Sequence, residues 1–314
     1  MVRYSIVTSI YRDGYLARDF CLQVGGIFSD YLGIEFSGLA SDIELIFVND
    51  GSPDDSLESL IDVKNYFPFV KVVDLSRNFG QHEALACGFR LASGDCVIRM
   101  NVDMQDPPAE LPKLLREIET GAWDMVVGQY AERNSPWLNR LSAHLYFEVF
   151  RLLTGQNVLQ RTSPMRVMNR TFLDAYNALT EKSRFPQGLD GWLGFRQKYI
   201  DIEHRPRTVG KSAYTIWSRT RLALTGILYF SDRPLKFIGY FGLILAFFGL
   251  FLGGGVILEK LLGGDLLPGY ASLAAIAFVG FGIQIAFMGV LGLYVGRIFR
   301  EVQNRPLYII RKVY

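Results

Sequence analysis

The sequence is short of cysteine, of net charge and of apolar residues at its start. Its three cysteines lack Cys-x-x-Cys spacing, which argues against a disulfide framework and favours reduced thiols in a cytosolic domain. The net charge of +2 is too balanced to indicate a nucleic-acid partner. The first residues, MVRYSIVTSIY, lack the long apolar run of a secretory signal and are typical of a strand.

Charge is also missing from two long stretches, at residues 237–258 and 266–296. A bilayer core needs about 20 apolar helical residues, so each stretch is long enough to span a membrane. Two buried core helices are the alternative, but core helices rarely lack charge on every face over such lengths. We therefore expect two transmembrane helices, at about 237–258 and 270–296, within a membrane segment over 237–296.

The charges that flank these stretches predict their orientation. The loop 259–265 between them holds one lysine and two acids. Basic residues lie on the outer sides, at Arg233, Lys236, Arg297, Arg300, Arg305, Arg311 and Lys312. Because basic flanks stay in the cytoplasm, we expect a hairpin with both termini inside. This predicts an integral membrane protein, of the inner membrane if the source is bacterial, with a cytoplasmic domain over 1–214 and a basic cytoplasmic tail over 297–314.

Short β-branched runs alternate with helical stretches through the first part of the chain. We expect strands at 3–10, 43–48, 70–75, 96–100 and 124–128, and helices at 15–32, 54–66, 81–92 and 108–120. This alternation predicts an α/β domain whose parallel sheet is covered by helices on both faces. Ligands bind such sheets at the carboxyl ends of the strands, where the polar segments 9–13, 49–56, 76–81 and 101–106 follow.

The rest of the chain before the apolar stretches is less regular. The segments 136–160 and 171–199 have mixed helical patterns, and a basic loop follows at 203–214. The segment 215–236 contains an amphipathic helical pattern directly before the first apolar stretch. Such a helix is expected to rest in the membrane interface.

The polar segments carry the side chains of a metal and phosphate site. Asp103 and Gln105 are two residues apart, so in extended backbone they lie on the same side. Their oxygens suit Mg²⁺ or Mn²⁺, which share ligands with substrate phosphates and would neutralise a diphosphate leaving group. Asp50 is placed to accept hydrogen bonds from a base or ribose. Each turn alone is explained better by an ordinary Asx turn or helix cap, but together they favour a nucleotide-diphosphate site.

A basic group lies shortly before the membrane segment, at Arg205, Arg207 and Lys211, next to Ser212. Three cations close to a bilayer are also expected simply from attraction to anionic headgroups. The sharper hypothesis is a clamp for an anionic acceptor headgroup or for the donor diphosphate.

Seven motifs in order give the chain a family resemblance. They are VNDGSPDDS, LSRNFGQHEALACGFRLASGD, NVDMQDPPAELP, GLDGWLGF, RTVGKSAYT, FSDRPL and EVQNRPLYII. The chain resembles the GtrB-type polyprenyl-phosphate glycosyltransferases, relatives of dolichol-phosphate mannose synthase in glycosyltransferase family 2. The resemblance covers nearly the whole chain. It implies a GT-A (Rossmann-like) fold and inverting transfer of a sugar from an NDP-sugar, here expected to be a UDP-sugar, to a polyprenyl phosphate.

The resemblance also implies roles for individual residues. Asp103, Arg166 and Arg207 would be catalytic, and Asp103 and Gln105 would bind the metal. The acceptor or diphosphate would be held by Arg205, Arg207, Lys211 and Ser212. The nucleotide-sugar would be bound by Ser9, Tyr11, Asp13, Val48, Asp50, Asn78, Asn101, Val102 and Asp103. Asp190 is expected either to meet the sugar or to be a solvated helix carboxylate.

The chain departs from the family pattern at several positions. Ser9 replaces a proline, Asn101 replaces the first acid of the D-x-D-x-Q motif, and Ala213 replaces a lysine whose charge Lys211 is placed to supply. Pro164 stands where aspartate is common. The implied acceptor is a phosphate monoester with a second pKa of about 6, so it is already a nucleophile and needs no proton removed. We therefore expect the Pro164 substitution to alter which sugar is held, not to abolish transfer.

Two other functions compete with this hypothesis. A polysaccharide synthase, acting on a growing polymer, usually carries a Q-x-x-R-W motif, and the sequence has none. A non-catalytic NDP-sugar-binding membrane scaffold would account for Asn101 and Pro164, but not for the acids and arginines that are kept. The GxxxG spacings at Gly249 and Gly253, and at Gly292 and Gly296, permit a homo-oligomer or packing within the hairpin.

Overall fold

The computed structural model describes residues 2–130, 148, 151–152, 162–182, 186–204, 232–262 and 269–314. The chain divides into two units, which are described separately. The first comprises Met1–Glu148, Gln156–Thr215 and Arg305–Tyr314, and the second comprises Val149–Gly155 and Ile216–Asn304.

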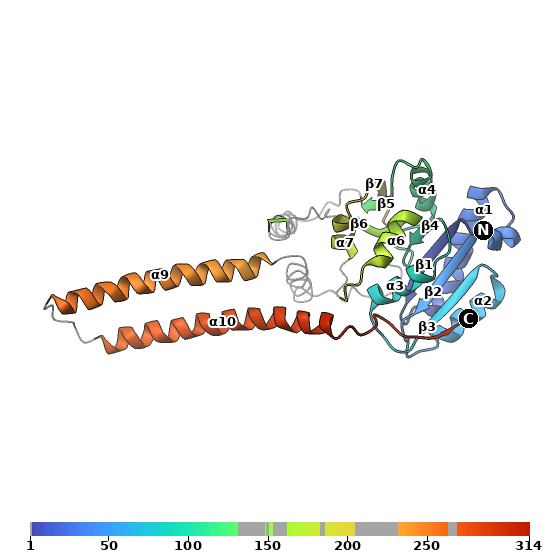
Figure 1. Ribbon diagram of the computed structural model, residues 1–314. Helices are drawn as coiled ribbons and strands as arrows, with labels where there is room; N and C mark the ends of the chain where they lie inside the picture. Colours follow the sequence, from blue (N-terminus) through green and yellow to red (C-terminus); the bar gives the residue numbers. More distant parts are fainter. Residues whose placement is uncertain are drawn as a thin grey trace. The chain divides into compact units, whose positions relative to one another are not determined.

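The first unit is built on a mixed sheet with the strand order β7-β5-β6-β4-β1-β2-β3-β8 in the described part of the chain (Figure 1). The four strands β4, β1, β2 and β3 run parallel, whereas β6 and β8 pair with their neighbours in antiparallel fashion. Their bounds are β1 Tyr4–Ile10, β2 Ile43–Asn49, β3 Val70–Leu75, β4 Cys96–Arg99, β5 Met125–Tyr130, β6 Thr162–Asn169, β7 Gln197–Ile202 and β8 Ile310–Val313.

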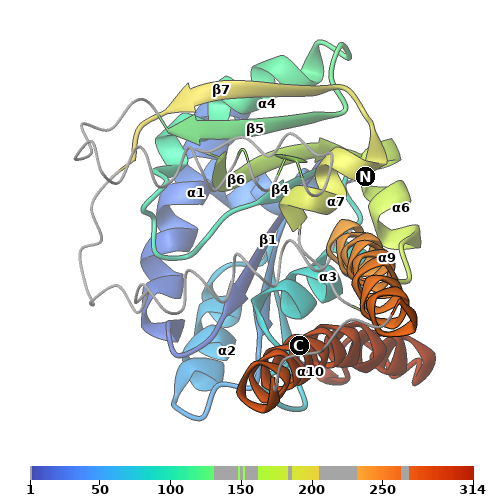
Figure 2. The ribbon, with the colours of Figure 1, turned by 90° about the vertical axis from the view of Figure 1, so that its left-hand side faces the viewer.

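Helices pack on both faces of this sheet (Figure 2). Their bounds are α1 Ala17–Leu32, α2 Ser56–Tyr66, α3 Gln81–Leu91, α4 Leu111–Glu119, α6 Arg170–Ala178 and α7 Pro186–Leu193, with 3-10 turns η1 Gly14–Leu16, η2 Phe36–Ser41 and η3 Pro108–Glu110. The main core lies between the strands and α1, α2 and α4, where Phe20 meets Phe47 with ring centroids 6.1 Å apart. On the other face, α3 packs on β1 and β2 and contacts α6.

The α/β class and the parallel centre of the sheet are confirmed, and the first four strands and helices lie within three residues of their predicted positions. The expectation of a parallel sheet is wrong on both sides of this centre, because β6 and β8 pair antiparallel with their neighbours. β6 enters antiparallel between β4 and β5, and β7 lies in a region expected to be helical. We expected the residues 297–314 to form a separate tail. Instead, the helix α10 (Tyr270–Val302) extends to Val302, and β8 then pairs with β3.

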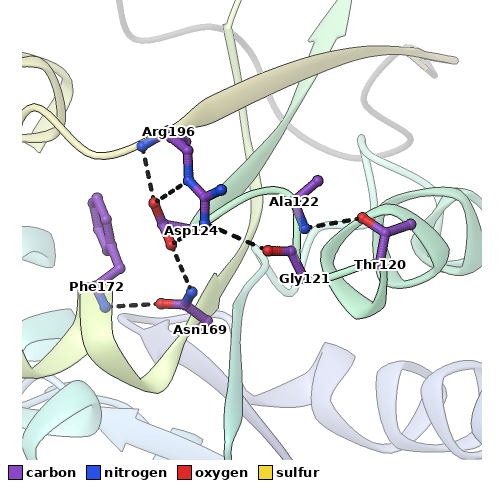
Figure 3. Close-up of polar contacts among 7 residues, drawn as sticks. All are labelled: Thr120, Gly121, Ala122, Asp124, Asn169, Phe172 and Arg196. Atoms are coloured by element: carbon purple, nitrogen blue, oxygen red, sulfur yellow. Dashed lines mark hydrogen bonds and ion pairs between the residues drawn. The ribbon is translucent and has the colours of Figure 1, made fainter.

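Asp124 holds the β5, β6 and β7 edge together through a polar junction (Figure 3). Its carboxylate accepts hydrogen bonds from the Asn169 amide at 3.0 Å and from the backbone N–H and Nε of Arg196 at 3.0 and 3.3 Å. Asn169 also caps α6 by accepting the Phe172 N–H at 2.8 Å. The contact with Arg196 lowers the pKa of Asp124, so the carboxylate stays charged where β5 and β7 begin.

The second unit contains two long apolar helices, α9 (Arg233–Leu261) and α10 (Tyr270–Val302). They lie side by side, and Phe241 of α9 meets Phe287 of α10 edge-on at 5.9 Å between ring centroids (Figure 1). Among the described residues, one helix is long and apolar enough to cross a membrane, Val279–Val302, with a mean hydropathy of 1.8 and no part of it buried. A second crossing by α9 stays a prediction. The expected interfacial helix over 215–236 lies mostly outside the described residues.

Two helical glycines offer a matched test of the packing between α3 and β1. A Cβ on Gly88 would lie 2.3 Å from Val7 Cγ1, whereas a Cβ on Gly26 of α1 meets open space. We predict that Gly88→Ala lowers the free energy of unfolding by about 1–3 kcal/mol through overpacking. Gly26→Ala is predicted to raise it by about 0.5–1 kcal/mol through helix propensity. Denaturant unfolding of the full chain in detergent measures both, and equal effects would contradict the close packing at Gly88.

Candidate functional site

The parallel strands β1 to β4 bring four polar segments to one edge of the sheet. Ile10 is in register with Asn49, and Asn49 with Asp74, so the tips of β1, β2 and β3 are level. β4 pairs with the other side of β1 and ends at Arg99, directly before the polar loop. The residues that follow these strands therefore share one edge, where α/β sheets bind ligands.

Asp50 fixes the loop after β3. It is buried, and its two carboxylate oxygens accept the backbone N–H groups of Phe79 at 2.7 Å and Gly80 at 2.9 Å. Burial raises the pKa of Asp50, against the opposing effect of these two hydrogen bonds. The residue expected to contact the nucleotide thus also ties the β2 turn to the β3 turn. A carboxylate has about four lone-pair sites, and these two N–H groups occupy two of them.

The β2 turn is also close to its neighbours on both sides. Gly51 has φ +60°, and a Cβ there would lie 2.3 Å from the carbonyl carbon of Arg77, so only glycine fits. On the other side, the Arg12 N–H donates to Ser52 Oγ at 3.2 Å. Arg12 itself has φ +65°, which places the β1 tip in the left-handed region.

The other residues predicted to bind the nucleotide-sugar are placed at this edge in different ways. Tyr11 and Asn78 are exposed, and Ser9 and Asp13 are half-buried. Val48 and Val102 are buried in the core, so only their backbone groups are left to face a ligand. The predicted clamp residues Arg205, Arg207, Lys211 and Ser212 lie outside the described residues.

The loop after β4 presents a carboxylate and two amides. Asp103 Oδ1 accepts the Gln105 N–H at 3.3 Å across Met104, whose φ is +51°. Gln81, the first residue of α3, donates to Asn101 Oδ1 at 3.4 Å. Asn101, Asp103 and Gln105 are all half-buried, which leaves them accessible from the edge.

These donors fit a divalent cation that is completed by a substrate. The described residues contain no group of three or more His, Cys, Asp or Glu side chains that could hold a metal by themselves. Mg²⁺ is usually bound by one or two carboxylates together with substrate phosphates and water. Asp103 would supply the carboxylate, and Gln105 and Asn101 would supply amide oxygens of the hard type that such ions prefer.

Asp106, next to Pro107, connects the β4 loop to the neighbouring strands. It is buried and accepts hydrogen bonds from the Tyr130 hydroxyl at 2.8 Å and from Ser163 Oγ. His204 Nδ1 lies 3.6 Å from Asp106 Oδ1. These contacts connect the β4 loop to β5 and β6, and so fix where Asp103 begins its turn.

Two buried arginines lie next to this loop. Arg99 of β4 and Arg166 of β6 are in register, and each is less than 8% exposed. Arg166, predicted to be catalytic, forms an ion pair with buried Asp190 of α7. Asp190 is therefore not a solvated helix carboxylate, because Arg166 compensates its charge in the interior. A signal for this existed in GLDGWLGF, where an acid interrupts an apolar stretch.

A small cavity of about 10 Å³, with room for one water molecule, adjoins these charges. Its lining comes from α3, α6, α7, β4 and β6, through His82, Leu85, Phe89, Arg99, Arg166, Met168, Tyr176 and Asp190. His82 is the next residue after Gln81, which contacts Asn101. The cavity therefore lies behind the polar loop and belongs to the support of the site.

The chain is similar in sequence to known proteins over most of its length. The family described as Glycosyl transferase family 2 matches residues 37–176. The glycosyltransferase sll0501 of Synechocystis sp. is 38% identical, over 85% of this chain and 84% of its own. A SfII prophage-derived bactoprenol glucosyl transferase of Shigella flexneri is 35% identical, over 86% of this chain and 88% of its own. Among solved structures, the mannosyltransferase PcManGT from Pyrobaculum calidifontis in complex with GDP-Man and Mn²⁺ is 15% identical with a TM-score of 0.48, over 96% and 88% of the chains.

His82 predicts a pH dependence of stability. Burial, followed by the charges of Arg99 and Arg166, lowers the pKa of His82 to about 4. An unfolded histidine has a pKa of about 6.5, so between pH 6.5 and 4 the unfolded chain binds more protons than the folded one. Stability attributable to His82 is therefore present above pH 6.5 and is lost as the pH falls through this window, by about 2 kcal/mol at pH 5.

Comparison with His82→Gln isolates this effect. Denaturant unfolding at pH 7 and pH 5 should show a fall in unfolding free energy that is about 2 kcal/mol larger for the wild type than for the variant. The same fall in both proteins would show that His82 is not held neutral beside the two arginines.

Proposed function

The chain belongs to glycosyltransferase family 2, and from this premise we propose that it transfers a sugar from a nucleoside-diphosphate donor to a polyprenyl phosphate. The family expected from the motifs is confirmed, which makes the chain an enzyme and sets aside the non-catalytic scaffold. The Shigella flexneri relative is a bactoprenol glucosyl transferase, and this supports a polyprenyl acceptor. The observation that carries the proposal is the meeting of the Asp50 turn and the Asp103 loop at one edge of the sheet.

The edge divides into two ends with different chemistry. The tips of β1, β2 and β3 form the nucleotide end, with Asp13, Asp50 and the exposed amide of Asn78 around the turn. The β4 loop forms the diphosphate end. There a divalent cation, Mg²⁺ or Mn²⁺, would be held by Asp103 and Gln105, and when bound it supplies charge neutralisation to the departing diphosphate. A UDP-sugar is the proposed donor.

The reaction needs alignment and charge stabilisation more than proton transfer. An oxygen of the acceptor phosphate attacks the anomeric carbon, and the bond to the diphosphate breaks with its electron pair on the leaving oxygen. Attack from the opposite face inverts the configuration. Because the phosphate is mostly dianionic at pH 7, no general base is required, and Pro164 does not block the step. Arg205, Arg207, Lys211 and Ser212 are proposed to hold the two anions in place.

Arg166 is proposed to act from behind the reacting atoms. Its burial and its ion pair with Asp190 hold the guanidinium in one position on β6, in register with Arg99 of β4. Fixed charges in a dry environment stabilise developing charge more strongly than mobile ones in water. We propose this role for Arg166 in place of direct contact with the substrate.

A lipid acceptor requires access to a membrane, which α10 supports with an apolar, unburied stretch. We propose that α9 and α10 cross the membrane as a hairpin, with the sheet domain on the cytoplasmic face and both termini inside. An inner-membrane location, if the source is bacterial, and a homo-oligomer through the small residues of the helices belong to the same proposal.

Asp103→Ala tests the diphosphate end. We predict a loss of about 100-fold or more in transfer to polyprenyl phosphate, the usual cost of removing a group that stabilises developing charge. The assay uses the full chain in detergent with an NDP-sugar and polyprenyl phosphate. Asp30→Ala, which removes an exposed carboxylate from α1, is the control and should keep wild-type activity. Full activity in Asp103→Ala would show that the site is elsewhere.

Asn101→Asp tests the cation. A second carboxylate in the β4 loop should lower the Mg²⁺ or Mn²⁺ concentration needed for half-maximal activity, because binding strengthens with ligand charge. Direct Mn²⁺ binding to the full chain, followed by electron paramagnetic resonance, should tighten in parallel. Unchanged metal dependence in both measurements would place the cation away from residue 101.

A further inference from the structure

The last strand of the chain closes the edge of the sheet next to the nucleotide end. β8 follows α10 in sequence and runs antiparallel to β3, with Asp74 opposite Lys312 and Leu75 opposite Ile310. One step along β3 thus corresponds to two along β8, which makes Arg311 the extra residue of a β-bulge. Bulges redirect side chains and are common next to active sites.

Arg311 uses this position to make two contacts with the end of β3. Its Nη1 lies 3.2 Å from Asp74 Oδ2, and its Nη2 donates to the Ser76 carbonyl oxygen at 2.8 Å. Asp74 is 1% exposed, so its charge needs a partner inside the protein. Ser76 begins the loop whose later residues Phe79 and Gly80 donate to Asp50. The Arg311 guanidinium therefore holds both the buried charge and the start of this loop.

Asp74 connects this contact to the β2 turn through hydrogen bonds. Its Oδ1 accepts the Asn49 amide N–H at 2.8 Å, and Asn49 Oδ1 accepts the Ser52 N–H at 3.3 Å. A carboxylate only accepts hydrogen bonds, so Asn49 must turn its NH₂ toward Asp74 and its oxygen toward Ser52. Ser52 Oγ in turn accepts the Arg12 N–H at 3.2 Å. One line of polar contacts thus runs from β8 across the tips of β3, β2 and β1.

We propose that Arg311 is a positioning residue for the nucleotide end of the donor site, acting through Asp74, Asn49 and Ser52. The inference rests on the proposed function, which places the donor nucleotide on these three strand tips. Removing the guanidinium leaves the Asp74 carboxylate buried without its cation, which favours rearrangement of Asn49 and of the turn that contains Asp50. The residue that sequence reasoning used as a marker of membrane orientation thus supports the donor site.

Lys312 provides a matched control from the same strand. It is the next residue after Arg311, is also exposed, and carries the same charge. Its Nζ lies 4.3 Å from the ring centroid of Tyr314, and within the described part of the chain it forms no ion pair with Asp74, although the two residues are opposite in register. A general effect of positive charge, or of weakening β8, should appear in Lys312→Met as well as in Arg311→Met.

The test compares Arg311→Met with Lys312→Met in the full chain in detergent. We expect Arg311→Met to raise the Kd for UDP or GDP, measured calorimetrically with Mn²⁺, and the donor KM by about tenfold, within the usual range of coupling between sites. The acceptor KM and the kcat at saturating donor should stay within about twofold of wild type, since the reacting end is untouched. Lys312→Met should match wild type. Arg311→Lys, which keeps a cation for Asp74 without the two-pronged contact, should lie between.

A double variant separates positioning from loss of folding. When Arg311→Met is combined with Asp74→Asn, no buried charge is left and the new amide still offers an oxygen to Asn49, so nucleotide affinity should recover most of its loss. Wild-type affinity and donor KM in Arg311→Met would overturn the inference alone, as would equal losses in Lys312→Met. A wild-type chain that binds neither UDP nor GDP would contradict the proposed function, and this inference with it.

Discussion

The pairing of the buried Asp50 carboxylate with the backbone of Phe79 and Gly80 is the interaction on which the rest of the edge depends. Parallel strands leave their tips level but do not join them, because each is followed by a separate loop. Asp50 joins the turn after β2 to the loop after β3, and the hydrogen bond between Asn49 and Asp74 joins the ends of the same two strands. Ser52 connects the β2 turn to the tip of β1 through the Arg12 N–H. The proposed nucleotide end thus consists of three turns that are far apart in the sequence and are joined by hydrogen bonds.

The diphosphate end is supported differently, by charges and hydrogen bonds behind the loop. Asp106 is tied to Tyr130 and Ser163, and Arg166 is neutralised by Asp190. Arg99 and Arg166 bring two buried cations close to one carboxylate, and His82 stays neutral beside them. Such an arrangement costs stability and suits a site that receives anions. The loop that carries the half-buried side chains of Asn101, Asp103 and Gln105 is thus anchored to β5 and β6 through Asp106.

How much could be predicted from the sequence differs between these parts. The centre of the sheet was predictable because β1 to β4 are short apolar runs, each followed by a polar turn, and periodicity reports that pattern. β6 was missed because Pro164 and Arg166 interrupt its apolar run. The burial of Arg166 depends on an ion pair with Asp190, which is 24 residues away in the sequence and could not be predicted from the local pattern. β8 was missed because Arg311 and Lys312 look like a cytoplasmic tail, and their place beside β3 depends on long-range pairing. Asp50 and Asp103 were proposed as site residues from their turns, whereas the contacts of Asp50 with Phe79 and Gly80 could be identified only from the fold.

Sugar transfer to a lipid phosphate is tested most directly by measuring product formation with and without that lipid. The purified full chain would be incubated with each of several NDP-sugars and Mg²⁺ or Mn²⁺, in the presence and absence of undecaprenyl phosphate. We expect lipid-dependent NDP release with at least one donor. The amount of NDP released should equal the amount of lipid-phosphate sugar formed. No lipid-dependent turnover with any donor would contradict the proposed transfer.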